Sequence, residues 1–163
     1  MSILRFLDAF FVRGLATLCG LLFAVMLVAI LGQVLMRYAF SAPLSWSEEL
    51  ARYTMVWLAM LASALCARKG QHLALIGAEM LPPRLRLPLR LIGTVIACAI
   101  LSVLFWHGWD PAERAIRQRT PGLGLSMSWI YAALPTGFAL MILGQLLGLF
   151  VPEEPAPAEP AAH

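Results

Sequence analysis

Charge is scarce in this sequence. Asp, Glu, Lys and Arg make up 13% of its 163 residues, whereas apolar residues make up 61% and the mean hydropathy is +0.80. Soluble domains carry about a quarter charged residues and about half apolar ones. The composition therefore excludes an ordinary soluble domain and indicates an integral membrane protein.

Catalytic and metal-binding patterns are missing as well. The sequence has no Gly-rich phosphate loop, no HExxH motif and no nucleophile elbow. Its three cysteines form no CxxC pair, so we expect them to pack as small apolar residues. In the four-span topology derived below, His72 and His107 lie on opposite sides of the membrane, which disfavours a haem held between them. We expect no enzyme activity, metal site or cofactor.

Long uncharged runs fill most of the chain. They cover residues 14–36, 53–67, 91–109 and 120–152. A helix needs about 20 mostly apolar residues to cross a bilayer, and the second run reaches this length only if residues 48–52 join it. The first run is longer than a secretory signal core, so we expect an uncleaved helix. We predict an all-α integral membrane protein, one domain over residues 1–151, with four transmembrane helices at about 14–36, 46–67, 89–109 and 129–151.

The remaining segments have simpler interpretations. Residues 71–81 are largely apolar but too short to cross the membrane, which predicts a short interfacial helix between spans two and three. Residues 152–163 are rich in Pro, Ala and Glu, which is typical of a disordered tail.

Charge also orients the chain in the membrane. Four spans place both termini and the middle connection on one side of the membrane. That side holds seven Lys and Arg residues against five on the other: Arg5, Arg13, Arg68, Lys69, Arg84, Arg86 and Arg90 against Arg37, Arg52, Arg114, Arg117 and Arg119. The positive-inside rule then favours cytoplasmic termini.

The most informative segment is 36–53, MRYAFSAPLSWSEELARY. Charges beside bilayer-length apolar runs are costly and usually pair with or anchor something. Residues 45–48 match a capping box, and Glu48 and Arg52 have i,i+4 spacing. We hypothesise an ion-pair network that ties the ends of the first two helices together beside the interfacial Trp46, formed by Arg37, Glu48, Glu49 and Arg52. The alternative is a helix cap whose charges reach the membrane interface without contacting a partner.

The last span carries small residues on one helical face, at Gly137, Gly144 and Gly148. This spacing allows helices to approach closely, either within the chain or against another subunit. The cores of the spans hold no charge, and their main polar groups are Gln33 and Gln145. A transporter of charged solutes needs a polar pathway, so the chain is better explained as an accessory subunit.

Three motifs occur in order between about residues 34 and 140. They are R-Y-x-F-x-x-P-L-x-W-x-E-E-x-A-R at 37–52, G-x-H at 70–72, and T-P-x-L-G-L followed by W-x-Y-x-x-L-P-x-G-F at 120–138. Together they resemble the small membrane subunit, the DctQ type, of tripartite ATP-independent periplasmic (TRAP) transporters. Ser126 departs from the pattern, because related sequences often carry proline before the tryptophan.

The resemblance implies a non-catalytic subunit in the bacterial inner membrane that supports a large multi-span permease. In such systems a periplasmic binding protein captures an organic acid, and the large subunit carries it inward with sodium. The expected partners are therefore the large permease, the binding protein and the lipid bilayer, with no nucleic acid. The alternatives are the small subunit of a tripartite tricarboxylate-type transporter, a haem-binding redox subunit and an autonomous exporter.

Overall fold

The computed structural model describes residues 2–42, 44–68 and 83–150. Their regular elements are helices, apart from one isolated β-bridge: α1 (Ser2–Ala39), α2 (Ser45–Arg68), α4 (Pro83–Arg114), the 3-10 turn η1 (Ala115–Arg117), α5 (Ser128–Tyr131) and α6 (Ala133–Phe150). Four helical segments are long and apolar enough to cross a membrane, and α5 and α6 together make the fourth. This confirms the predicted all-α protein with four spanning helices. The interfacial helix expected at 71–81 and the tail 152–163 lie outside the described residues.

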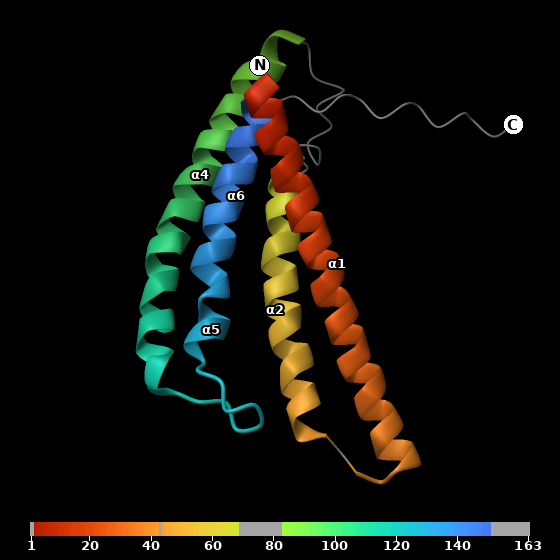
Figure 1. Cartoon of the computed structure of the whole chain (residues 1–163). Helices are drawn as coiled ribbons and strands as arrows, with labels where there is room; N and C mark the ends of the chain where they lie inside the picture. Colours follow the sequence, from red (N-terminus) through yellow and green to blue (C-terminus); the bar gives the residue numbers. More distant parts are fainter. Residues whose placement is uncertain (1, 43, 69–82, 151–163) are drawn as a thin grey trace, which may run out of the picture.

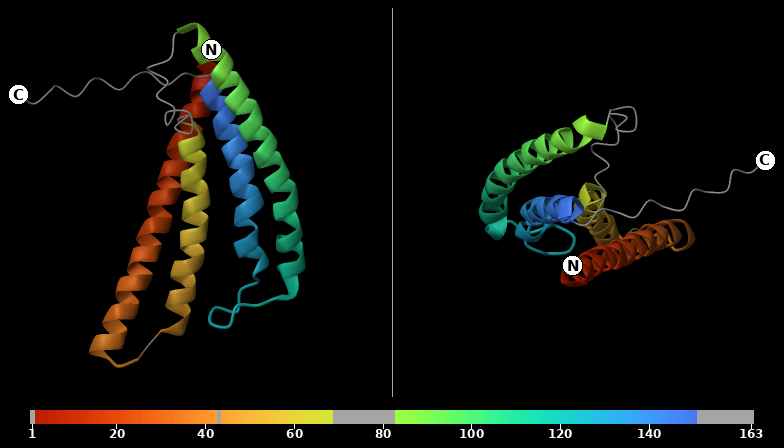
Figure 2. Two further views of the ribbon diagram at one scale, coloured as in Figure 1. Left: turned by 180° about the vertical axis from the view of Figure 1, so that it is seen from behind. Right: turned by 90° about the horizontal axis from the view of Figure 1, so that it is seen from above.

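The helices pack in the row α1, α2, α6, α4 (Figures 1 and 2). The view from above shows α4 curving along the far side of α6, and α1 at the other end of the row against α2. Two prolines inside α4, Pro88 and Pro111, each remove a backbone N–H donor, and proline of this kind bends helices. With 38 residues, α1 is about 57 Å long at 1.5 Å per residue, so it extends beyond a hydrocarbon core of about 30 Å.

Small residues make the contacts between the helices. In the described ranges, the buried apolar residues are six alanines and one leucine, Leu61. Large apolar side chains point outward instead, and Phe6, Phe10 and Val28 are each more than 70% exposed. Helices in a bilayer gain little by hiding apolar surface from lipid, so close contact between small residues holds them together.

The glycine face of α6 packs against α2. A Cβ added at Gly144 or Gly148 would lie closer than 3.0 Å to the carbonyl oxygen of Ala64 or Arg68, respectively. A Cβ at Gly137 would overlap a methionine side chain of α2. The two backbones can therefore approach this closely only where α6 has glycine. Of the two uses considered for these glycines, the structure shows packing within the chain.

Candidate functional site at the helix ends

The connection between η1 and α5 is shaped by its own hydrogen bonds. The Thr120 N–H donates to the Leu125 carbonyl at 2.8 Å, and the Thr120 hydroxyl accepts from the Leu125 N–H at 3.1 Å. Gly124 has a φ of 66°, which glycine adopts without strain, and its N–H donates to the Thr120 carbonyl at 3.0 Å. An isolated β-bridge closes the base of the loop. These bonds therefore fix the direction of two successive backbone N–H groups in the loop at residues 120–125, those of Gly122 and Leu123.

Glu49 joins this loop to the first turns of α2. Its Oε1 accepts the Gly122 N–H and its Oε2 accepts the Leu123 N–H, each at 3.0 Å. Successive N–H groups form a concave nest that suits an anion, and hydrogen bonds to a charged acceptor are stronger than neutral ones. The contact joins residues more than 70 positions apart. It ties the lower end of α2 in Figure 1 to the connection that follows α4.

Glu48 has a different role from its neighbour. Its carboxylate pairs with Arg52 at 3.2 Å, and both side chains are about two-thirds exposed (64% and 65%). Arg37, in the last turn of α1, makes no hydrogen bond or ion pair within the described ranges. The structure therefore brings Glu48 and Arg52 together on one helix, places Glu49 against another element and leaves Arg37 apart from them.

The start of α2 differs from the predicted capping box. The Ser47 hydroxyl donates to the Leu44 carbonyl at 2.7 Å, and neither bond of a capping box forms among the described residues. The Glu48 carboxylate, which would complete the box, accepts a hydrogen bond from Arg52 instead. Trp46 is partly exposed and lines an apolar cavity of about 440 Å³ between α1 and α2.

A second polar joint, which sequence reasoning missed, connects the opposite ends of α1 and α2. The guanidinium of Arg68 forms a fork on the Asp8 carboxylate, with Nη2 donating to Oδ2 at 2.7 Å and Nε donating to Oδ1. The side chains are 7% and 14% exposed, and forked pairs of this type are the strongest ion-pair geometry. One feature of the sequence could have indicated this joint, because Asp8 is the only carboxylate before Glu48.

The interiors of the spans offer little chemistry. Gln145 is buried, and its Oε1 has no hydrogen-bond partner within the part of the chain that the structure describes. No group of three His, Cys, Asp or Glu side chains gathers among those residues. His107 is exposed on α4, and His72 lies outside the described ranges. The polar contacts of the described charged side chains thus lie at the helix ends.

Comparison with known protein families decides what kind of chain carries these joints. The family described as "Tripartite ATP-independent periplasmic transporters, DctQ component" matches residues 26–151. The chain belongs to the DctQ family. The matched region includes Glu49, the loop that binds it and the glycine face of α6, whereas Asp8 precedes it.

Individual relatives agree with this assignment. Over 130 residues, the DctQ-family chain is 28% identical to the sialic acid TRAP transporter small permease protein SiaQ of Vibrio cholerae. This match covers 79% of this chain and 75% of SiaQ. Over 124 residues it is 29% identical to the sialic acid TRAP transporter permease protein SiaT of Haemophilus influenzae. That match covers 76% of this chain but 20% of SiaT. A sequence of the small-permease type thus also occurs within a longer permease chain, in keeping with a family that works with a large permease.

Proposed function

We propose that this DctQ-family chain is the small, non-catalytic membrane subunit of a sodium-coupled TRAP transporter. It supports a large permease subunit in the uptake of an organic acid that a periplasmic binding protein delivers. Sodium binding and solute translocation belong to the large subunit in this proposal.

The observation that supports the proposal is the use of charge in this chain. A pathway for an organic anion needs a cation or other polar groups within the membrane. Here the described charged side chains lie toward the helix ends, and three of them, Asp8, Arg68 and Glu49, are engaged in contacts between elements. Small residues pack closely where α2 meets α6. These features suit a subunit that supports the large permease, which provides the pathway for the organic anion.

The proposed placement is the bacterial inner membrane with both termini in the cytoplasm. The Glu49 joint then faces the periplasm, and the Asp8–Arg68 joint faces the cytoplasm. The loop at residues 120–125 would lie on the side from which the binding protein approaches, held in position by Glu49.

Reconstitution in proteoliposomes tests the proposed function. We expect inward, sodium-dependent uptake of a radiolabelled organic acid when this chain, the large permease and the loaded binding protein are all present. Sialic acid, named for two of the relatives, is a suitable first solute. We expect no uptake by this chain alone. Transport by the isolated chain would contradict the proposal and favour an autonomous carrier, and full uptake by the large permease without this chain would also refute it.

Of the sites Arg37, Trp46, Glu48, Glu49 and Arg52, the proposal assigns support of assembly to Glu49, which alone of the five is bonded to the loop at residues 120–125 in the described part of the chain. Charge reversal separates their roles. Glu49→Lys removes the bond to the loop, whereas Glu48→Lys affects an exposed pair within one helix. We expect Glu49→Lys to reduce co-purification with the large permease and then uptake, and Glu48→Lys to leave both near wild type. Equal behaviour of the two variants would count against a supporting role for the loop contact.

A further inference from the structure

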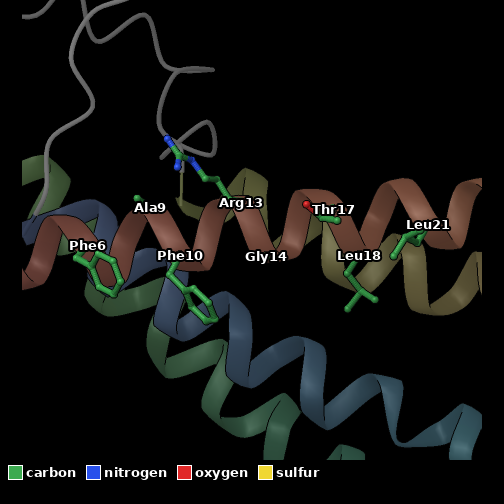
Figure 3. A pocket seen from close by; sticks show the side chains of 8 residues that line it. All are labelled: Phe6, Ala9, Phe10, Arg13, Gly14, Thr17, Leu18 and Leu21. Carbon is green, nitrogen blue, oxygen red and sulfur yellow. The ribbon is translucent and has the colours of Figure 1, made fainter.

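A groove runs along α1 near its N-terminal end (Figure 3). It has a volume of about 640 Å³, and its described lining comes from α1 itself. Phe10 and Leu18 form one edge, Arg13 and Thr17 stand on the other, and Gly14 lies between them. A Cβ added at Gly14 would meet no atom within 4 Å. The glycine therefore leaves the floor of the groove open.

The groove combines one cation with apolar surface at a defined depth. Arg13 is the last charged residue before the uncharged run 14–36, so we expect its guanidinium where the hydrocarbon region begins. It is exposed and makes no hydrogen bond or ion pair with any described residue. From Arg13 to Leu21 the helix rises about 12 Å at 1.5 Å per residue. This approaches the depth of one leaflet, half of a core of about 30 Å.

We propose that this groove binds one phospholipid, with its phosphate on Arg13 and an acyl chain lying over Gly14 towards Leu21. A guanidinium suits a phosphate because its planar donors can form two parallel bonds to it. The nearest carboxylate along the helix, Asp8, is already held by Arg68 and does not neutralise Arg13. The apolar lining continues from the cation into the membrane, so charge and shape together select a lipid. This site requires no partner subunit and goes beyond the proposed function.

Native mass spectrometry of the purified full-length chain in mild detergent tests the site. The added probes are phosphatidylglycerol and a diacylglycerol with the same acyl chains but no phosphate. Gly14→Leu fills the floor of the groove. Gly20→Leu is its matched control, because Gly20 also has open space around it but does not line the groove. Both changes favour the helix, so both variants should fold.

The charge is tested in the same way. Arg13→Gln removes the proposed phosphate ligand, and Arg5→Gln removes a cation from the same end of α1 outside the groove. We expect Arg13→Gln and Gly14→Leu each to weaken phosphatidylglycerol binding roughly tenfold. The first variant loses a charge-assisted hydrogen bond to the phosphate, and the second loses the space in which the acyl chain lies. The control variants should bind like wild type. The diacylglycerol should bind wild type roughly tenfold more weakly than phosphatidylglycerol does.

Three results would overturn the lipid site. Equal binding by all variants, or equal binding of both probes, would mean that α1 attracts only a general layer of lipid. Unchanged lipid binding by Gly14→Leu together with lost co-purification with the large permease would mean that the groove receives a protein helix instead.

Discussion

Glu48 and Glu49 are neighbours in sequence but lie in different surroundings. Successive residues of an α-helix point about 100° apart, so one side chain of such a pair can face a neighbouring element while the other faces outward. Glu49 meets two backbone N–H groups of the loop at residues 120–125. Glu48 meets only the flexible side chain of Arg52 within the described part of the chain. Contacts of the first kind stabilise a tertiary structure, whereas exposed pairs of the second kind contribute little.

Neutralising each glutamate tests this difference. In Glu49→Gln, one carboxylate oxygen becomes an amide group that cannot accept the loop N–H. We expect a loss of about 1–3 kcal/mol, seen as a lower melting temperature in thermal unfolding in detergent, at roughly 2–4 °C per kcal/mol. Glu48→Gln is the matched control and should change stability by less than about 0.5 kcal/mol. A control that melts as low as Glu49→Gln would show that the loop bond is not the cause.

The Asp8–Arg68 pair leads to a stronger prediction. Asp8→Asn removes the carboxylate charge from the buried pair with Arg68, and breaking a buried pair from one side costs about 3 kcal/mol. Asp110→Asn is the control, because Asp110 is exposed and forms no ion pair among the described residues. Thermal unfolding of both variants, with a double-mutant cycle through Arg68→Gln, measures the coupling. Additive effects in the cycle would contradict a direct pair.

Helices α2 and α6 meet backbone to backbone. The glycines of α6 lie over carbonyl oxygens of α2, which cannot move aside as a flexible side chain can. In a membrane this close approach is a main source of helix association. The α2–α6 contact therefore forms the centre of the row, with α1 and α4 attached on its two sides.

Alanine substitution tests that contact. A Cβ at position 144 would lie 2.7 Å from the Ala64 carbonyl oxygen, so Gly144→Ala must push the helices apart. We expect a destabilisation of about 1–3 kcal/mol, partly offset by the better helix propensity of alanine. Gly20→Ala meets open space and should be neutral or stabilising by up to about 1 kcal/mol. Denaturation in mixed micelles measures the stability of both variants. Equal stability of the two would contradict the prediction.

The described part of the chain is a row of helices in which two polar joints lie at opposite ends. Asp8 and Arg68 connect one end of the α1–α2 pair, and Glu49 connects the other end of α2 to the connection after α4. Between these joints the outer surface is largely apolar, as a bilayer requires. We therefore propose that the joints lie at the two faces of the membrane, and the excess of arginine and lysine predicts which face is cytoplasmic.

Cysteine labelling tests this orientation. In a variant whose native cysteines are replaced by serine, we introduce Leu125→Cys in the loop or Arg5→Cys near the N-terminus, both at exposed positions. A membrane-impermeant maleimide added to intact cells with a permeable outer membrane should label Leu125→Cys at once. It should label Arg5→Cys only after the inner membrane is opened. The reverse pattern would place the termini in the periplasm.

The amino-acid sequence alone was enough to establish four spanning helices and the family, because uncharged length and motif order are local properties of the chain. It also placed Glu48 and Arg52 together, since helical spacing brings them close whatever the rest of the chain does. The partners of Asp8, Glu49 and the α6 glycines emerged only from the folded chain. These contacts join residues 60 or more positions apart, and they depend on the order and rotation of the helices. Helices that are apolar on nearly every side have no amphipathic face to specify that rotation, so close packing of small residues and polar contacts at the helix ends set it instead.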